Sequence, residues 1–383
     1  MKASTPIKML IFTHYSAYYG ANRSLVDLLL GLRQLNYGLK VIAPSEGEFT
    51  EVLQKQNLDY EVVPFYPSIY STTRLSFFLK KKRYKKNTQS LDILKSIVKD
   101  FAPDYIYTNS SVMDLGFRLA KLTQTPHIWH IREMAELHYG YKFYPSKAAF
   151  VNALKESALI IPISQAIANA VLIPNQVTNY KVLFDAVFAQ KDFDELDFKS
   201  SPQKSNFVFT TIGFLHPSKH QAEIIKAFRA VEKKHPNAEL WIVGNGQLLY
   251  TLYLKFLILF FGLSKKVKLL GYLSDISKIY SDSDAIIMAS EHEGLGRCTI
   301  EGMAYQKPVI GYASGATVEL IDHGKRGLLY TDHSIGLAEA MEELINNPEL
   351  AQQLGENGRQ YVSKNFITAE YITQFNNIIS AVK

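Results

Sequence analysis

The sequence predicts an α/β protein built from two doubly wound parallel sheets in tandem. Short apolar runs of strand length alternate with longer amphipathic segments of helix length, a pattern typical of parallel strands joined by helical crossovers. The pattern stops in the polar stretch 190–206 and then begins again. At 383 residues the chain is long for one compact core, so we expect two domains.

The first half contains the apolar runs of one sheet. A helical pattern at 21–35 separates the first two runs. These segments define a first domain over residues 1–195. We expect its strands at 8–15, 39–44, 60–65, 104–109, 126–131 and 158–163.

The second half repeats this organisation over residues 196–365. A terminal helical segment, 366–383, is expected to return to the first domain. Ligands of such sheets bind beyond the carboxyl ends of the strands, and two sheets in tandem leave an interdomain cleft for them. We expect the strands of this half at 207–214, 238–244, 267–273, 284–290, 307–312 and 327–331.

Cysteine content and hydropathy limit the cellular compartments in which the protein is expected. A lone cysteine, Cys298, cannot form an intramolecular disulfide, which favours a reducing compartment. The first residues turn polar too soon for a signal peptide, and the most apolar run, 256–263, is far shorter than the roughly 20 residues that cross a bilayer. We therefore expect a cytoplasmic protein without a transmembrane segment. The overlapping segment 253–261 is expected to be buried helix core rather than a membrane or subunit contact.

Positive charge is concentrated in one segment, residues 74–86. It contains seven Lys and Arg residues and no acid, and the rest of the chain is close to neutral. Such local basicity argues against a general nucleic-acid surface. Beside aromatic residues it suits an anionic membrane surface, and a solvated mobile loop is the alternative. The candidate membrane residues are Phe77, Phe78, Lys80, Lys81, Lys82, Arg83, Lys85 and Lys86.

Two residues stand where helix N-termini would present N–H groups to an anion. Gly20 follows the first strand and precedes a helix, so the backbone could approach a phosphate there. Taken alone, this glycine is more simply explained by a tight turn. Lys219 stands at the entrance to a helix of the second domain, which is unfavourable for a cation unless an anion neutralises it. A solvated lysine is the alternative.

The segment IVGNGQLL (242–249) has a strand, two glycines and a helix, which suggests a dinucleotide-binding turn. The third glycine of that fingerprint is absent, because Leu249 occupies its place, and no acid follows at the expected distance. We interpret the segment as a plain strand-to-helix turn.

Two glutamates, Glu293 and Glu301, lie eight residues apart after the strand at 284–290. Glu293 is expected on the loop beyond the strand, and Glu301 about one to two turns into the next helix. Two carboxylates would repel an anion, so we expect them to accept hydrogen bonds from neutral hydroxyls, such as those of a sugar and a ribose. A plain helix-surface position is the alternative for Glu301.

In sequence order, these residues resemble the retaining nucleotide-sugar glycosyltransferases of family 4. The segment EGLGRCTIE (293–301) is similar to the E-x7-E motif of that family, and 302–330 continues as in its members. The resemblance covers essentially the whole chain and implies the GT-B fold, in which two Rossmann-like domains face a cleft. Further similar segments are HIRE (130–133), IGFLHPSKHQ (212–221), VGNGQ (243–247), LLGY (269–272) and LGENGRQYV (354–362).

The resemblance also implies roles for individual residues. Glu301 would bind the ribose hydroxyls of a donor nucleotide, and Glu293 the hydroxyls of the transferred sugar. Lys219 would contact the diphosphate, Gly20 would face it from the other domain, and His130 would meet the donor sugar near the reacting centre. The remaining donor-binding positions are Gly213, Leu295, Gly296, Gly315 and Ala316.

Three positions depart from the family pattern. The turn 213–215 lacks the arginine that members often carry, and Arg297 is our candidate for the missing positive charge. His220 takes the place of a glycine, and Ala316 that of the second glycine of a pair. We expect Lys219, Arg297 and helix N–H groups to stabilise the departing diphosphate. No motif here indicates a metal site, so we expect no metal and no other cofactor.

These motifs lead to a hypothesis about activity. We expect retaining transfer of a hexose-type sugar from a UDP or GDP sugar to a glycan or lipid-linked oligosaccharide. The setting would be bacterial surface polysaccharide assembly at the inner face of the cell membrane, with no nucleic-acid partner. The alternatives are a nucleotide-sugar epimerase on the same fold and a non-catalytic sugar-binding protein. The E-x7-E context disfavours the first, and the phosphate-facing cations disfavour the second.

Overall fold

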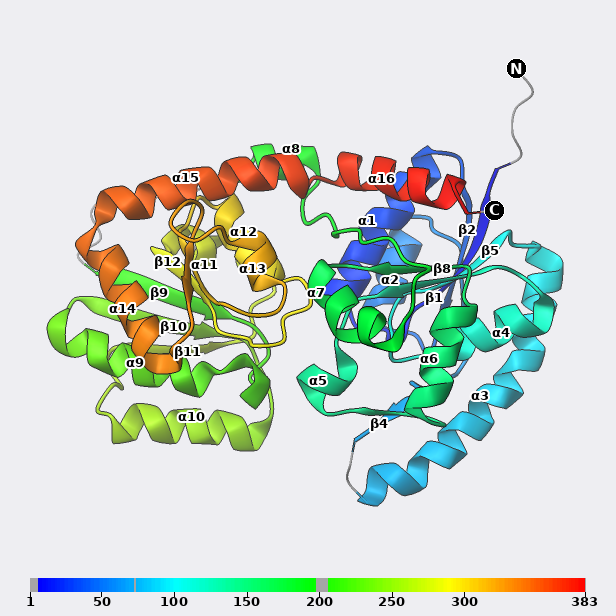
Figure 1. The fold of residues 1–383 in the computed structure, drawn as a ribbon, viewed down its shortest axis with the longest axis horizontal. Helices are drawn as coiled ribbons and strands as arrows, with labels where there is room; N and C mark the ends of the chain where they lie inside the picture. Colours follow the sequence, from blue (N-terminus) through cyan, green and yellow to red (C-terminus); the bar gives the residue numbers. More distant parts are fainter. Residues whose placement is uncertain (1–5, 72–73, 198–205, 383) are drawn as a thin grey trace. The chain divides into compact units, whose positions relative to one another are not determined.

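The computed structural model describes residues 6–71, 74–197 and 206–382, which fall into two compact units (Figure 1). Unit 1 comprises Met1–Ala186 and Thr368–Lys383, and unit 2 comprises Val187–Ile367. Inside the helix that begins at Arg74, the side chains of residues 74–78 lie outside the description, and these include Phe77 and Phe78.

Unit 1 is built on a six-stranded, fully parallel sheet with the order β3-β2-β1-β5-β6-β8. The chain proceeds outward from β1 in one direction and then from β5 in the other, so these two strands flank the switch point of the sheet. A short antiparallel pair, β4 with β7, lies outside it. The strands are β1 (Lys8–Phe12), β2 (Gly38–Ala43), β3 (Tyr60–Val62), β4 (Ile69–Tyr70), β5 (Tyr105–Thr108), β6 (His127–Ile131), β7 (Lys142–Phe143) and β8 (Leu159–Pro162).

Helices cover both faces of this sheet. Side chains alternate along β1, so Met9 and Ile11 enter the core under α1, α2 and α16, whereas Leu10 and Phe12 enter the core under α3 and α4. The helices of the unit are α1 (Gly20–Gln34), α2 (Glu48–Lys55), α3 (Arg74–Phe101), α4 (Leu115–Thr123), α5 (Ala135–Tyr139), α6 (Lys147–Glu156), α7 (Gln165–Ile167) and α16 (Thr368–Ser380).

The last helix, α16, packs on α1 and so completes unit 1 (Figure 1). A Cβ on Gly31 of α1 would lie 2.3 Å from Cγ1 of Ile372, so the glycine allows the two helices to approach closely. The Tyr37 hydroxyl donates to Asn376 at 2.7 Å, and the Tyr105 hydroxyl donates to the Val382 carbonyl at 2.9 Å. These contacts explain how a segment from the end of the chain belongs to the first unit.

Unit 2 has its own six-stranded parallel sheet, with the order β11-β10-β9-β12-β13-β14 and a switch point between β9 and β12. Its strands are β9 (Phe207–Ile212), β10 (Ala238–Val243), β11 (Val267–Gly271), β12 (Ala285–Met288), β13 (Val309–Tyr312) and β14 (Leu328–Tyr330). Its helices are α8 (Gln190–Asp194), α9 (Gln221–Lys234), α10 (Leu248–Phe260), α11 (Ser277–Asp282), α12 (Arg297–Ala304), α13 (Thr317–Leu320), α14 (His333–Asn346) and α15 (Pro348–Asn365).

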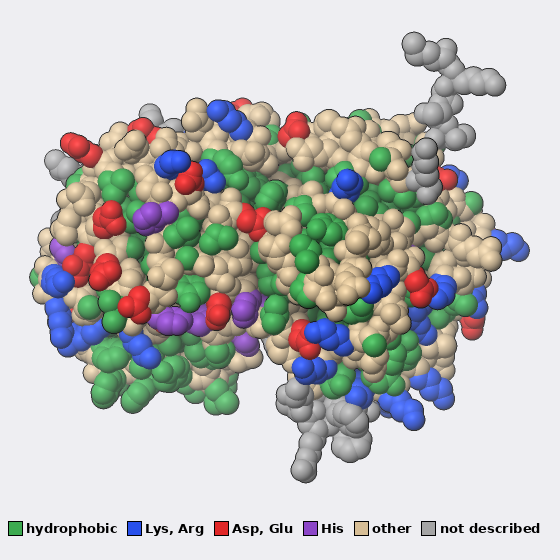
Figure 2. Space-filling model, in the orientation of Figure 1, with side chains coloured by type: hydrophobic (Ala, Val, Ile, Leu, Met, Phe, Trp, Pro, Cys, Tyr) green, Lys and Arg blue, Asp and Glu red, His purple; other side chains and the backbone are tan. Residues whose placement is uncertain are grey.

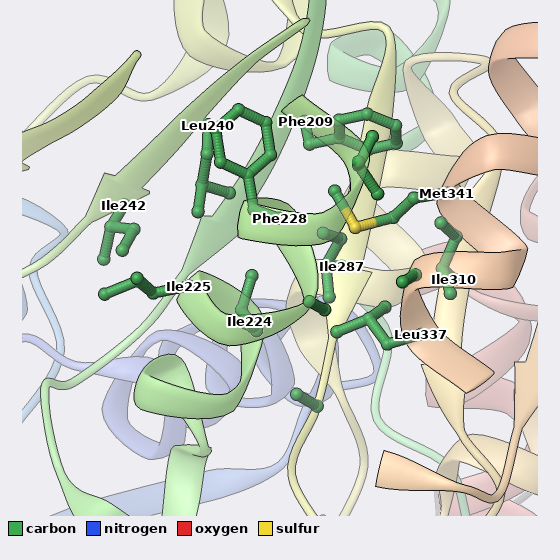
Figure 3. Packing of buried hydrophobic residues seen from close by; sticks show 14 of the residues in the cluster. Phe209, Ile224, Ile225, Phe228, Leu240, Ile242, Ile287, Ile310, Leu337 and Met341 are labelled. Carbon is green, nitrogen blue, oxygen red and sulfur yellow. The ribbon is translucent and has the colours of Figure 1, made fainter. Parts of the chain in front are cut away.

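One face of this second sheet is closed by α9 and α14 (Figure 3). Ile224 and Phe228 occur four residues apart on α9, and Leu337 and Met341 do so on α14, so each helix presents one apolar stripe. Both stripes pack on Phe209 of β9 and its neighbours. The core holds the strands in register, and the strands position the loops that follow their carboxyl ends.

The structure confirms the predicted fold class and every predicted strand, apart from shifts at the ends. One alternative and one expectation about surface segments were wrong. The alternative of a mobile loop for residues 74–86 is wrong, because these residues lie in helix α3. The apolar segment 253–261 is not wholly buried, because one face of α10 is exposed. Among the described residues, no helix combines the length and hydropathy needed to cross a bilayer.

Candidate functional site

The segment between β12 and α12 carries the two glutamates singled out in the sequence. Gly296 precedes α12 with φ of 86°, a left-handed conformation that a glycine adopts without strain. Glu293 therefore lies on the loop, and Glu301 lies in the second turn of the helix, as predicted. Leu295, also on the loop, is buried.

The loop after β13 supports Glu293 from the other side. The Ala316 amide donates to the Glu293 carbonyl at 2.9 Å. Gly315 has φ of 57°, and a Cβ there would lie 2.8 Å from the Glu293 nitrogen. Gly315 and Ala316 are thus brought next to the E-x7-E loop, and their small size is what permits the contact.

Lys219 and Glu293 form an ion pair although 74 residues separate them in sequence. The Lys219 Nζ lies 2.6 Å from Glu293 Oε2, with 19% and 14% of the two side chains exposed. Lys219 ends a single 3-10 turn, Pro217–Lys219, that follows β9. Because β9 and β12 are neighbours in the sheet, the segments that follow their carboxyl ends meet at one edge.

Arg297 and Glu301 form a second pair, one helical turn apart on α12. The Arg297 Nε lies 3.5 Å from Glu301 Oε1, and the Tyr280 hydroxyl donates to Glu301 Oε2 at 2.7 Å. Tyr280 stacks on Tyr305 with ring centroids 5.1 Å apart. Its pKa is raised well above the usual value by burial and by the charge of Glu301, so the phenol remains a donor. Glu301 is thus held in place, whereas sequence reasoning missed Tyr280, which no motif marks.

Charges from both pairs act on the thiol of Cys298. Its pKa is raised to about 12, chiefly by burial and then by the charge of Glu293; Glu301 adds to the rise, and Lys219 opposes it. The glutamates and Lys219 therefore form one cluster, which we call the α12 cluster: Lys219, Glu293, Arg297 and Glu301. A thiol with so high a pKa is not a nucleophile at neutral pH.

Packing on both sides fixes the helix that carries this cluster. A Cβ on Gly302 would lie 2.8 Å from Ile286 of β12, and a Cβ on Gly355 of α15 would lie 2.1 Å from the Gln306 carbonyl. The Arg359 guanidinium donates to the Ala304 carbonyl. The late motif LGENGRQYV (354–362) thus contributes small residues and one arginine that hold α12.

The glycines of VGNGQ are explained by backbone packing. A Cβ on Gly244 would lie 2.0 Å from the Gly213 carbonyl oxygen, and one on Gly246 would lie 2.1 Å from that of Leu215. Two backbone hydrogen bonds close this turn: the Leu215 amide donates to the Asn245 carbonyl at 2.9 Å, and the Gln247 amide donates to the Leu215 carbonyl at 3.0 Å. This is the plain strand-to-helix turn expected from the sequence, and it fixes the loop that contains Gly213.

Two of the departures from the family pattern have a visible structural consequence. Phe214 is exposed, and its ring stacks on His216 with centroids 6.4 Å apart, so no cation occupies this position. His220 has φ of 54°, where a glycine would be unstrained. Its ring turns toward Glu223, with Nδ1 2.9 Å from the carboxylate, and Glu223 also lies 3.0 Å from Nδ1 of His333.

In unit 1, Gly20 begins α1 next to a loop that is held from within. The buried side chain of Asn22 donates to the carbonyls of Tyr15 and Ala17, at 3.0 and 2.8 Å, and accepts from Thr13. The loop that leads to Gly20 is therefore ordered by one asparagine. Sequence reasoning missed Asn22, although a polar residue within an apolar helical stripe was an available signal.

The structure places His130, which the resemblance puts near the donor sugar, in the interior of unit 1. It is fully buried, hydrogen-bonded to the Tyr107 hydroxyl through Nδ1, with Asp185 3.9 Å from Nε2. Arg132 pairs with Asp185 and donates to Asn109 at 2.6 Å. Burial, together with the charge of Arg132, lowers the pKa of His130 well below its usual value. In this structure His130 belongs to a buried polar network, because neighbouring side chains cover it, and a sugar could reach it only if they moved.

The predicted membrane patch lies on α3, and part of it is engaged by tyrosine rings. The Lys80 ammonium lies 4.0 Å from the centroid of Tyr70, and Arg83 and Lys86 lie 5.7 and 5.6 Å from that of Tyr66. Such cation–π contacts hold the cations without neutralising them. The remaining cations of the patch, Lys81, Lys82 and Lys85, are exposed.

Comparison with known proteins identifies the part of the chain that carries the α12 cluster. Residues 192–361 match the model of the family described as glycosyl transferases group 1. Over this stretch, which is less than half of the chain, the sequence is similar to that family. Within the described residues, no group of three or more His, Cys, Asp and Glu side chains could hold a metal ion.

Relatives match over part of the chain. The glycosyltransferase EpsD of Bacillus subtilis is 29% identical over 180 residues, which cover 47% of this chain and 46% of that protein. N-acetyl-alpha-D-glucosaminyl L-malate synthase of Bacillus anthracis is 24% identical over 231 residues, 59% of this chain and 60% of that protein. The chain therefore spans about half to three fifths of the length of these two relatives.

A solved structure matches over nearly the whole chain. Anabaena HepE in complex with UDP-glucose superposes with a TM-score of 0.81 at 22% identity, covering 98% of this chain and 100% of that one. At this identity the likeness assigns the fold, which is GT-B: two Rossmann-like domains, each with a parallel sheet.

Proposed function

We propose that the protein is a retaining glycosyltransferase that moves a hexose-type sugar from a nucleotide-diphosphate sugar, of UDP or GDP type. The acceptor would be a glycan or a lipid-linked oligosaccharide of bacterial surface polysaccharide assembly. The observation that carries this proposal is the α12 cluster, which places two carboxylates and two cations at one sheet edge. The family of residues 192–361 and the UDP-glucose held by HepE support it.

Each pair of the cluster suits one part of such a donor. Glu301 would accept hydrogen bonds from the ribose hydroxyls. Its two carboxylate oxygens are already oriented by the Tyr280 hydroxyl and by Arg297. Glu293 would accept hydroxyls of the transferred sugar, with the backbone around Leu295, Gly296, Gly315 and Ala316 lining that position. Gly213 would allow the backbone of unit 2 to approach the donor.

Lys219 and Arg297 would then stabilise the leaving diphosphate. Both cations pair with carboxylates that are not fully buried. A diphosphate could therefore interact with the same cations at a moderate cost in free energy. The bond between the anomeric carbon and the phosphate oxygen breaks, the acceptor oxygen bonds to that carbon on the same face, and the acceptor proton passes to the departing diphosphate. The cations lower the barrier by neutralising the charge that develops on the diphosphate. The reaction as proposed needs no metal ion.

Transfer activity of cluster variants tests this proposal. Lys219→Ala and Glu301→Gln should each lower kcat/KM by about 10²–10³, the usual cost of removing one group that stabilises developing charge or orients the donor. Lys234→Ala is the matched control, because Lys234 pairs with Glu342 at the far end of α9. Near-normal turnover in both cluster variants would contradict the proposal.

Two further measurements separate the proposal from its alternatives. Incubation with UDP-glucose or GDP-mannose in the absence of acceptor should leave the sugar unaltered, whereas an epimerase would convert it. Addition of EDTA should leave turnover unchanged if Lys219 and Arg297 carry the charge. A protein that binds the nucleotide sugar but transfers nothing to any glycan acceptor would be a sugar-binding protein.

A further inference from the structure

Helix α10 exposes an apolar face that the packing of unit 2 does not explain. Its buried side, with Tyr250, Leu254, Leu257 and Ile258, packs against the core like that of any surface helix. The opposite side, where a polar face is the rule, is also apolar. The exposed residues are Leu248, Leu249, Leu252, Tyr253, Phe256, Leu259 and Phe260, with exposures from 43% for Tyr253 to 81% for Leu249.

These side chains form one continuous stripe. Position 249 lies three and four residues before 252 and 253, these lie four and three residues before 256, and 256 lies three and four residues before 259 and 260. The six positions therefore share a face over nearly the whole helix. Figure 2 shows the corresponding concentration of hydrophobic side chains over α10. A contiguous patch of this kind marks an interaction surface in a folded protein, whereas scattered apolar residues do not.

The charge around the stripe indicates what covers it. No Asp or Glu occurs between Glu239 and Asp275, and this stretch contains four lysines. Lys255 lies at the edge of the stripe and is exposed, as is Lys265 just beyond the helix. A surface that is apolar at its centre and basic at its edge fits an anionic lipid bilayer, with the helix lying along the interface.

Helix length and ring chemistry agree with a helix that lies on a bilayer and does not cross it. Thirteen residues of α-helix extend about 20 Å, which is less than the hydrocarbon thickness. Tyr253, Phe256 and Phe260 supply rings on the exposed side, and such rings suit the region between headgroups and acyl chains.

A second copy of the chain fits this surface less well. Two copies that paired along α10 would bring two stretches without any acid together, and their lysines would repel one another. We therefore propose that the exposed face of α10 docks unit 2 on an anionic membrane surface. This inference is independent of the sugar-transfer activity, because it uses no residue of the α12 cluster.

Vesicle flotation of the full chain tests the proposal. The wild-type protein should float with vesicles of phosphatidylcholine and phosphatidylglycerol, and less with phosphatidylcholine alone. The combined variant Leu249→Gln, Phe256→Gln, Leu259→Gln and Phe260→Gln should lower the partition coefficient at least about tenfold, because four large side chains lose their transfer free energy. The matched control, Leu35→Gln, Ile93→Gln, Leu122→Gln and Ile335→Gln, removes four exposed apolar side chains elsewhere and should float as the wild type does.

A second readout places the helix in the lipid directly. Tryptophan emission of Phe256→Trp should shift to the blue on addition of the anionic vesicles and should be quenched by brominated acyl chains. Three results would overturn the proposal: a wild-type chain that does not float, an α10 variant that floats as well as the wild type, or a lipid-free dimer that only the α10 variant dissociates. Circular dichroism and thermal melting of each variant show whether the fold is intact.

Discussion

Each unit of the molecule contains a charged cluster beside its sheet, and the two clusters differ in how deeply they are buried. In unit 1, Arg132 and Asp185 form an ion pair in which each side chain is only 3% exposed. In unit 2, the two pairs of the α12 cluster keep between 14% and 23% of each side chain exposed. A buried pair cannot exchange partners without leaving a charge unpaired in the interior, whereas a partly exposed pair can share its cation with a ligand. Exposure therefore separates the cluster that supports the fold from the cluster suited to bind a ligand.

The largest expected effect is that of acid, because three histidines of unit 1, the buried His127 and His130 and the partly exposed His14, have lowered pKa values and are neutral in the folded protein. Burial lowers the pKa of His14 and His127 to about 3, and Arg132 adds to the effect at His14; His130 is shifted in the same direction. The folded-state pKa values lie below the unfolded value of about 6.5, so in between only the unfolded chain binds these protons. Stability is complete above about pH 6.5 and falls as the pH decreases.

Because the unfolded chain binds three such protons, the free energy of unfolding of unit 1 should fall by about 4 kcal/mol for each pH unit of acidification between about pH 6 and 4. Urea unfolding at a series of pH values, followed by the fluorescence of the buried Trp129, measures this slope. The variant His14→Gln should lower the slope by about a third. Unfolding free energies of unit 1 that are equal at pH 7 and pH 5 would contradict the burial of these rings in neutral form.

The next largest effect is expected from Asp185→Ala, which leaves Arg132 charged and unpaired in the interior. We expect a loss of about 3–5 kcal/mol in the free energy of unfolding. Lys219→Met in the α12 cluster is the comparison, and there we expect about 1 kcal/mol, since Glu293 keeps some contact with solvent. Equal losses in the two variants, measured by urea unfolding, would mean that burial does not separate the clusters.

A smaller effect tests how the end of the chain holds unit 1 together. Gly31→Ala should destabilise the protein by about 1–3 kcal/mol, because the new methyl group would overlap Ile372 of α16. The control is Gly336→Ala on α14, where the nearest atom, Cβ of Tyr330, lies at 3.5 Å. There the same change should be neutral or stabilising, since alanine favours helices. A Gly31→Ala variant with the melting temperature of the control would show that α16 is not packed closely on α1.

The strands were predictable because strands of a buried parallel sheet are continuous apolar runs. The pair β4 and β7 was missed, since strands of two residues show no period. The positions of Glu293 on a loop and Glu301 in a helix could be predicted, because an apolar strand, a glycine-containing turn and a helical pattern follow one another in the sequence. The partner of Glu293 could not: the Lys219–Glu293 pair joins residues of separate segments, and only the strand order brings them together.

The errors share a different cause, which is the direction of a side chain. His130 is the last residue but one of β6, and the sequence alone does not show that its ring points into the polar interior of unit 1. The segment 253–261 is apolar around the whole helix, so its period does not reveal which side is exposed. The segment 74–86 was open to a loop interpretation because the apolar positions that place α3 on the sheet, Leu91, Leu94, Ile97 and Val98, come only after the basic run.

The smallest effect concerns Cys298, whose pKa depends on the charges of the α12 cluster. Its thiol has a pKa of about 12, so at pH 8 it should react with iodoacetamide at least about a hundredfold more slowly than a free cysteine thiol. Cys298→Ala should change transfer activity by less than about twofold and cost about 1 kcal/mol of stability, since the side chain only fills space.

The same thiol can report on its charged neighbours without any activity assay. Glu293 raises the pKa of Cys298 and Lys219 lowers it, so Glu293→Gln should speed the alkylation and Lys219→Met should slow it. The two opposite changes are expected only if both side chains lie beside the thiol as an ion pair. Equal rates in the wild type and both variants would place at least one member of the pair elsewhere, and the contrast with the buried pair of unit 1 would then lose its basis.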